Sequence, residues 1–151
     1  MDEIIVRINK KEDLGSVLKL AEDVFKPNRE EKEKYHKKSD WLEKLNNGLL
    51  VTAFVNEKIV GFAICYKKEN DLHIWNVGVL PEFRKMGIWR RMYKEIIKYA
   101  KNENYEVLSL NTYKDKFPGM YNFCKIEGFS EYATELDSLS GNVKSKFFKK
   151  L

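Results

Sequence analysis

A short basic loop between an apolar segment and an amphipathic segment is the feature of this chain best suited to chemistry. The apolar segment stops at Pro81, and the loop runs from Arg84 to Gly87. The segment after it predicts a helix, because apolar residues recur there at spacings of one, three and four: Ile88, Trp89, Met92, Tyr93, Ile96, Ile97 and Ala100. The first N–H groups of a helix have no partner within it and favour anions. Since Lys85 and Arg90 add positive charge and Gly87 allows close approach, the loop predicts a phosphate or pyrophosphate site.

The chain also holds two histidines, of which one is a candidate for proton transfer. His73 lies near the start of a predicted strand, and an ordinary histidine pKa of about 6.5 would let it act as a general base near neutral pH. The alternative is a surface histidine that follows the turn at residues 69–71. His36 lies in a charge-rich segment and is expected to be solvated.

Periodicity and turn residues predict the elements that position these groups. Strands are expected at residues 4–8, 49–55, 58–66, 72–80, 105–112, 129–136 and 143–148, and helices at residues 14–25, 28–47, 88–100 and 118–127. A hairpin is expected at Asn56-Glu57, and Pro118 suits the first position of a helix. The lysine-rich strand at residues 143–148 is interpreted as a solvated edge strand. The residues alone therefore predict a mixed α/β domain with a central sheet.

The basic loop resembles a known cofactor signature. The pattern Val79-x-Pro81-x-x-Arg84-x-x-Gly87-x-Trp89 is similar to the acyl-CoA signature of the GNAT superfamily of N-acetyltransferases, with Trp89 where that family usually has Gly or Ala. The predicted order β-α-α-β-β-β-α-β-α-β-β also matches the family, so the resemblance spans essentially the full chain. It implies an α/β (α+β) fold of three layers, with a central, mixed and mostly antiparallel twisted sheet flanked by helices. A single N-acetyltransferase domain over residues 1–151 is expected.

The resemblance implies where the cofactor binds. Acetyl-CoA would lie between the strand that ends at Leu80 and the strand that begins at Tyr105, with backbone amides near Gly78 holding the pantetheine and polarising the carbonyl. Gly78 fits a splay or bulge in that strand, and a small residue chosen for sheet packing is the alternative. The implied cofactor-binding residues are Val77, Gly78, Val79, Arg84, Lys85, Met86, Gly87, Ile88, Trp89, Arg90, Asn111 and Tyr121.

The resemblance also implies catalytic roles for His73, Tyr121 and Cys124. His73 lies six residues before Val79, where several family members carry a Glu or His that removes the amine proton. Residues 120–129 are similar to a C-terminal family motif in which a Tyr protonates the departing CoA thiolate. Cys124 stands in that place, either as a proton donor or as a small buried hydrophobe, and Tyr121, one turn earlier, is an alternative donor.

Another residue of this motif also departs from the family pattern. Phe117 stands where the family has an Asn ahead of the helix, and Asn111 is expected to supply that polar contact.

The expected function is that of an N-acetyltransferase. It would move an acetyl group from acetyl-CoA to a primary amine by direct transfer in a ternary complex. The alternative is a GNAT-like sensor or partner module that binds CoA without turnover, and Trp89, Phe117 and Cys124 at three signature positions keep this alternative open. The expected partners are acetyl-CoA and an amine-bearing acceptor, and a homodimer is compatible with the resemblance.

Composition limits the other classes of protein. A length of 151 residues with 43% hydrophobic residues suits one packed domain. No apolar run approaches the ~18 residues that span a bilayer, so no membrane association is expected. The acidic N-terminus lacks a signal pattern, and the two cysteines lack metal-type spacing, so we expect a cytoplasmic protein without a metal. The net charge of +5 is too small and dispersed to predict nucleic-acid binding.

Overall fold

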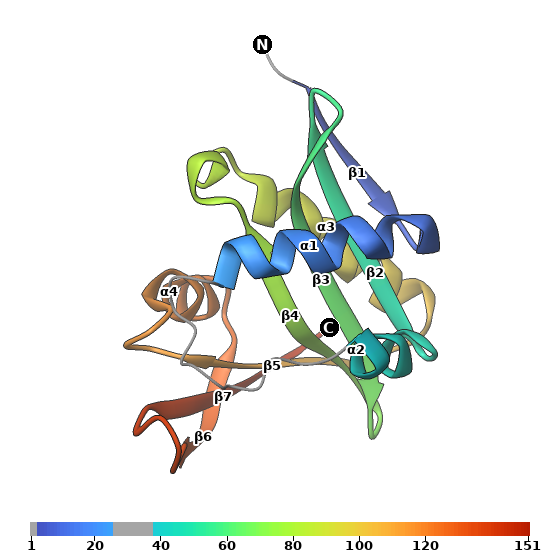
Figure 1. Ribbon diagram of the computed structural model, residues 1–151. Coiled ribbons are helices and arrows are strands. Elements are labelled where there is room, and N and C mark those ends of the chain that lie inside the picture. The colour runs from blue at the N-terminus through green and yellow to red at the C-terminus, as the bar shows by residue number, and fades with distance from the viewer. Residues whose placement is uncertain (1–2, 26–37) are drawn as a thin grey trace.

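A computed structural model of the chain describes residues 3–25 and 38–151, and its centre is a seven-stranded sheet (Figure 1). The spatial order is β1-β2-β3-β4-β5-β7-β6. Every neighbouring pair is antiparallel except β4 and β5, which run parallel. The predicted mixed, mostly antiparallel sheet is therefore confirmed. The strands are β1 (Ile4–Ile8), β2 (Gly48–Val55), β3 (Lys58–Lys68), β4 (Asp71–Val79), β5 (Val107–Tyr113), β6 (Ser130–Leu136) and β7 (Val143–Lys150).

Helices cover both faces of this sheet, as the predicted three-layer fold requires. Helices α1 (Leu14–Phe25) and α2 (Lys38–Leu45) pack on one face, and α3 (Ile88–Asn102) packs on the other, with α4 (Pro118–Ile126) beside it (Figure 1). Two short 3-10 helices, η1 (Lys11–Asp13) and η3 (Pro81–Phe83), lie in connections. The predicted helix over residues 28–47 is found as α2 in its second half. Its first half, with His36, lies outside the described residues.

Local sequence features explain why helix α3 and the hairpin between β2 and β3 form. Helix α3 buries Ile88, Met92, Ile96 and Ala100, one side of a strongly amphipathic segment. The hairpin between β2 and β3 turns at Asn56 and Glu57, whose φ angles of +50° and +68° give the tight two-residue turn that matches strand twist. Within the described residues, no helix is both long enough and apolar enough to cross a bilayer.

Strands β4 and β5 stay paired only briefly. Their parallel register joins Leu72 to Leu108, His73 to Ser109 and Ile74 to Leu110, and ends there. Beyond these pairs the two strands diverge, β4 continuing along β3 and β5 along β7 (Figure 1). Trp75 on β4 and Asn111 on β5 are the first residues past the separation. We call this point the vertex, defined by Trp75 and Asn111.

The irregularity of β4 lies at Trp75 and not at Gly78. Ile64 of β3 pairs with Asn76 and the next residue, Cys65, pairs with Ile74, so Trp75 is the extra residue of a bulge. Gly78 stays in register opposite Phe62. The bulge expected at Gly78 was therefore wrongly placed, because a glycine in a strand signals close packing as readily as a bulge. Close packing is what the structure has at Gly78, since a Cβ there would lie 2.7 Å from a Phe62 ring carbon.

The lysine-rich strand β7 is not at the edge of the sheet, contrary to the sequence prediction. It lies between β5 and β6, and β6 is the edge strand. The ammonium groups of Lys144 and Lys146 lie 3.9 Å and 3.6 Å from the Glu135 carboxylate on β6. Strand order depends on which partner a strand meets in space, so lysines that suit an edge are here balanced by a neighbouring strand.

We expect Gly78→Ala to destabilise the protein by about 1–3 kcal/mol, because the new methyl group would crowd Phe62 and Val24 of α1. Gly15→Ala is the matched control. Position 15 lies in α1 with no atom within 4 Å of an added Cβ, and the change should add roughly 0.5–1 kcal/mol through helix propensity. Urea unfolding followed by tryptophan fluorescence measures both. Equal stability of the two variants would contradict the packing role of Gly78.

Candidate active site

The basic loop and the start of α3 form a surface of backbone N–H groups. Lys85 and Gly87 have φ angles of +74° and +78°, so the loop turns through the left-handed region twice. Helix α3 then begins at Ile88 without a side-chain cap. An added Cβ at Gly87 would have nothing within 4 Å, which leaves the approach to these amides open. Uncapped first-turn amides and the helix dipole favour an anion here.

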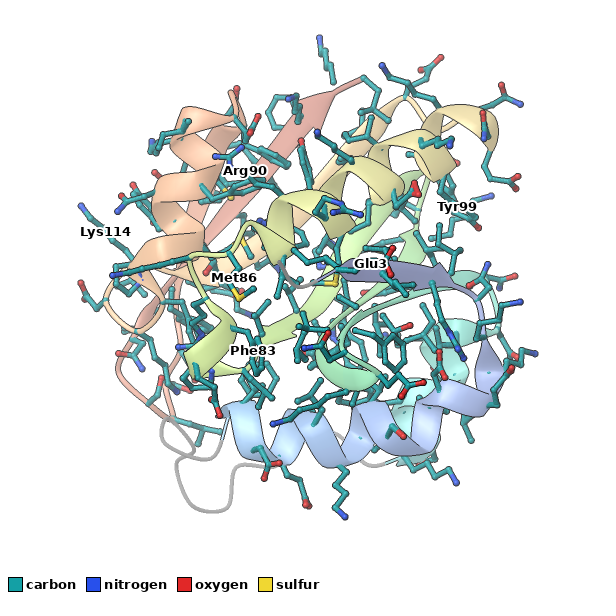
Figure 2. The ribbon with its side chains drawn as sticks, turned by 90° about the horizontal axis from the view of Figure 1, so that it is seen from above. Glu3, Phe83, Met86, Arg90, Tyr99 and Lys114 are labelled. Carbon is teal, nitrogen blue, oxygen red and sulfur yellow. The ribbon has the colours of Figure 1, made fainter. Side chains whose placement is uncertain are left out.

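The two arginines near this loop are held by other parts of the chain. The Arg84 Nε donates a hydrogen bond to the Val79 carbonyl oxygen at 3.0 Å, which fastens the loop to the end of β4. Arg90 forms an ion pair with Glu127 after α4, and its guanidinium lies 5.2 Å from the Phe123 ring centroid. Figure 2 shows Met86 in the loop and Arg90 farther along toward α4. The arginines therefore position the loop and helices as well as contributing charge.

Trp89 fills the contact between α3 and α4. Its ring centroid lies 5.3 Å from that of Phe123 and 5.7 Å from that of Tyr93. Within the described part of the chain, the Trp89 Nε1 and the Tyr93 hydroxyl are buried without a hydrogen-bond partner. The large side chain at a position where Gly or Ala is usual is therefore directed between two helices.

His73 is buried beneath the vertex, so the surface alternative for this residue is wrong. Only 4% of its surface is exposed, and its Nδ1 lies 2.8 Å from the Ser109 hydroxyl on β5. Burial, aided by the charges of Lys68, Lys44 and Lys144, lowers the pKa of His73 to about 4. The imidazole is therefore neutral at pH 7, and so low a pKa does not favour the predicted role as a base for an ammonium.

Cys124 and Tyr121, the two residues expected to lie near the CoA thiolate, occupy different environments. Cys124 is fully buried, and burial raises the pKa of its thiol to about 12, which matches the alternative of a small buried hydrophobe. The Tyr121 hydroxyl donates a hydrogen bond to the Glu131 carboxylate at 3.0 Å, and its ring lies against Phe147. Phe147 pairs with Leu110, the last β5 residue joined to β4, so Tyr121 lies one strand from the vertex.

The Glu131 carboxylate, which accepts the hydrogen bond from Tyr121, also accepts hydrogen bonds from other side chains. Hydrogen bonds from Ser145, Tyr121 and Lys125 lower the pKa of Glu131, with the Ser145 contribution the largest. Asn111 is half-buried at the vertex, opposite Lys146 of β7. The structure therefore places His73 in the paired part of β4, Asn111 at the vertex and Tyr121 against β7, while Cys124 lies within the core.

On the sheet face that α2 covers, the structure brings together a group of residues that the sequence did not connect. The rings of Tyr66 on β3 and Trp75 on β4 lie 6.4 Å apart, and Trp41 of α2 packs 5.7 Å from Trp75. Lys44 of α2 places its ammonium 4.2 Å from the Tyr66 ring centroid. These residues are distant in sequence and meet only because α2 lies across β3, so no local pattern signals them.

The sequence model of the acetyltransferase (GNAT) family matches residues 14–129, which include the basic loop, the vertex and α4. The chain belongs to the GNAT acetyltransferase family. Solved structures share the fold of this GNAT protein. The PaiA N-acetyltransferase of Thermoplasma acidophilum, in complex with coenzyme A, has 19% identity and a TM-score of 0.79, covering 99% of each chain.

Two further solved structures resemble the GNAT chain to a similar degree. The ribosomal-protein-alanine N-acetyltransferase of Brucella melitensis has 20% identity and a TM-score of 0.78, covering 97% of this chain and 99% of its own. A Bacillus anthracis protein in complex with acetyl coenzyme A has 17% identity and a TM-score of 0.75, covering 99% of this chain and 100% of its own. At these identities the likeness shows the fold. No curated protein matches the chain in sequence.

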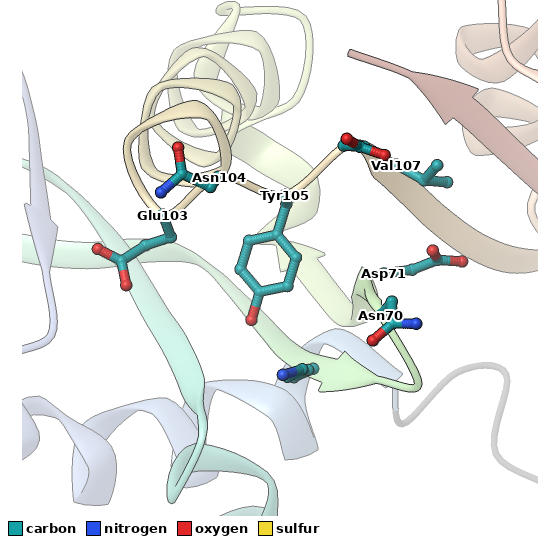
Figure 3. A pocket seen from close by; sticks show the side chains of 8 residues that line it. Asn70, Asp71, Glu103, Asn104, Tyr105 and Val107 are labelled. Carbon is teal, nitrogen blue, oxygen red and sulfur yellow. The ribbon is translucent and has the colours of Figure 1, made fainter.

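A cavity of about 500 Å³ lies at the other end of β4 and is distinct from the basic loop of the GNAT protein. Figure 3 shows Tyr105 between the end of α3, with Glu103 and Asn104, and the turn before β4, with Asn70 and Asp71. Burial, together with Glu69, raises the pKa of Asp71 despite the opposing charge of Lys68. Because several carboxylates line this cavity, it repels phosphate and is unsuited to the anion predicted for the basic loop.

The stability of the GNAT protein should depend on pH through His73. The folded-state pKa of His73, about 4, lies below the ordinary value of 6.5. Between pH 4 and pH 6.5 the unfolded chain therefore binds a proton at this residue that the native state does not bind. Stability should therefore fall by the order of 3 kcal/mol as pH drops from about 6.5 to about 4, relative to His73→Gln.

Urea unfolding at several pH values measures this difference, and His36→Gln is the control that retains it. In the His36→Gln variant the remaining imidazole can be titrated directly by NMR. A midpoint near 6.5 would contradict the buried, neutral state of His73.

Proposed function

We propose that the protein is an N-acetyltransferase that moves the acetyl group of acetyl-CoA to a primary amine by direct transfer in a ternary complex. One observation carries this proposal: β4 separates from β5 at Trp75 and Asn111, and β4 then leads through η3 and the basic loop to the uncapped start of α3. Membership of the GNAT acetyltransferase family supports acetyl transfer. The bound coenzyme A of the Thermoplasma acidophilum structure supports the choice of cofactor.

The separated strand supplies the surface that the cofactor needs. Backbone polar groups of β4 from Trp75 to Val79 that point away from β3 have lost β5 as a partner. We assign them to the pantetheine, with the amides near Gly78 polarising the thioester carbonyl. The pyrophosphate would bind at residues 84–90, with Gly87 as the point of closest approach. Asn111 faces the same space from β5.

The reaction itself requires little covalent chemistry from the protein. The amine nitrogen attacks the thioester carbonyl carbon, an N–C bond forms and the C–S bond breaks, and the nitrogen loses one proton while the CoA thiolate gains one. Only a neutral amine can attack, and the charges of Lys44, Lys68 and Lys144 that disfavour a protonated His73 also disfavour an ammonium nearby. We therefore propose that the amine binds as the free base. Tyr121 is the proposed group on the thiol side, and Cys124 serves packing.

The second candidate function is a GNAT domain that binds CoA without turnover. It is favoured by the two proton-transfer positions, since Cys124 is buried with a pKa of about 12 and His73 has a pKa of about 4. Neither group exchanges a proton readily at pH 7. Both candidate functions require the same cofactor site, so binding and turnover must be measured separately.

Gly87→Ala should weaken acetyl-CoA binding by about tenfold or more, because a Cβ at φ +78° strains the loop and covers the amides that receive the phosphates. Gly141→Ala is the matched control, with the same φ of +78° in the turn between β6 and β7 and equally open space around it. Calorimetric titration measures both affinities, and thermal unfolding measures both stabilities. Equal affinities for acetyl-CoA in the two variants would contradict the assignment.

Initial rates measured against both substrates should give intersecting double-reciprocal plots, as a ternary complex requires. The assay follows thiol release from acetyl-CoA with a panel of primary amines, and Cys124→Ala should retain transfer because the thiol is a packing group. Parallel plots with an acetylated enzyme would contradict direct transfer. Tight acetyl-CoA binding with no thiol release on any amine would favour the second candidate.

A further inference from the structure

The ammonium of Lys44 lies against two aromatic rings. It is 4.2 Å from the ring centroid of Tyr66 and 5.6 Å from that of Trp75. The two rings lie nearly perpendicular, at 86°, so they form two walls around the charge. Lys44 is half-buried on α2, and within the described part of the chain these rings are the partners shown for its ammonium. Aromatic rings stabilise the charge of an ammonium but leave its N–H groups available to a hydrogen-bond acceptor.

This cation lies close to the vertex, on the sheet face that α1 and α2 cover. Trp75 is both the bulged residue of β4 and the first residue past its pairing with β5. Trp41 of α2 packs 5.7 Å from the Trp75 ring, which fixes Trp75 on the α2 side. Helix α3, with the proposed cofactor loop, covers the opposite face. An acceptor that approaches the thioester from the face opposite α3 therefore passes Lys44.

Three lysines make the surroundings of His73 electropositive, although Lys144 is also paired with Glu135. Lys44, Lys68 and Lys144 all act on the buried His73 next to Tyr66, whose ring centroid lies 5.5 Å from that of His73. The Trp41 Nε1 adds a buried donor that has no acceptor within the described residues, in a side chain only 4% exposed. A second cation on the acceptor would be repelled here, whereas an anionic group would be attracted.

We propose that Lys44 is a binding residue for a carboxylate on the acceptor. This inference rests on the proposed function and narrows its substrate class. The acceptor is a primary amine on an apolar or aromatic body that also carries a carboxylate, as in an aromatic amino acid. The rings of Tyr66 and Trp75 orient the Lys44 ammonium and offer an apolar surface to the body of the acceptor.

Three amines of matched shape test the inference. L-phenylalanine carries the carboxylate, phenylalaninamide replaces it with a neutral amide, and phenethylamine lacks it. The variants are Lys44→Met, which removes the charge and keeps the chain length, Lys44→Arg, which keeps the charge, and Lys67→Met, which removes a charge from the neighbouring position on β3. Each kcat/KM is compared with that of the wild type on the same amine, so differences in amine basicity cancel.

The expected result is selective for the carboxylate. Lys44→Met should lower kcat/KM for L-phenylalanine roughly tenfold or more and change it less than about twofold for the other two amines. Lys44→Arg should keep most of the activity on L-phenylalanine, and Lys67→Met should leave all three amines unaffected. An equal loss on all three amines, or no loss on L-phenylalanine, would overturn the inference.

A binding experiment distinguishes a failure of this inference from a failure of the proposed function. The CoA-saturated protein is titrated with N-acetyl-L-phenylalanine and with N-acetylphenethylamine in a calorimeter. Preference for the first ligand that is lost in Lys44→Met supports the carboxylate site even where no amine is acetylated, in which case the proposed function fails alone. Equal binding of the two ligands overturns the carboxylate site whatever the turnover.

Discussion

The short pairing between β4 and β5 is the constraint on which the rest of the molecule depends. Each strand has another neighbour along its whole length, β4 with β3 and β5 with β7, so both remain paired after they separate. The bulge at Trp75 comes directly after the last shared pair, and bulges increase local twist. Separation leaves backbone donors and acceptors on two facing strands, and a ligand with amide groups of its own can satisfy them.

Glu127 joins the two parts of the sheet on the α3 side. Its carboxylate pairs with Arg90 of α3, and its backbone carbonyl accepts a hydrogen bond from the Lys149 Nζ of β7 at 2.8 Å. The rings of Trp89, Tyr93 and Phe123 pack beneath this junction. The contact between α3 and α4 therefore joins the two parts of the sheet where β4 and β5 do not pair, and it holds the basic loop in place relative to β7.

Local patterns predicted most of the fold. Apolar spacing was sufficient for α3, and Asn56-Glu57 was sufficient for the hairpin, because both depend on neighbours in sequence. The place of β7 and the bulge at Trp75 could not be predicted, since they depend on which strand lies alongside. At the site, the loop around Gly87 was visible in the sequence. The burial of His73 and the meeting of Lys44 with Tyr66 and Trp75 were not, because they arise from contacts between distant elements.

The brief junction between β4 and β5 also bears on the order in which the chain acquires its structure. Strands β2, β3 and β4 follow one another through tight turns, so their contacts are local and close quickly. Strand β5 reaches β4 only after the crossover through α3, and it gains three residue pairs by arriving. We therefore expect the last three strands to join the first four later than β2, β3 and β4 pair with one another. In the proposed function, a cofactor between β4 and β5 would contact both groups of strands and supply hydrogen-bond partners that the separated strands do not give each other.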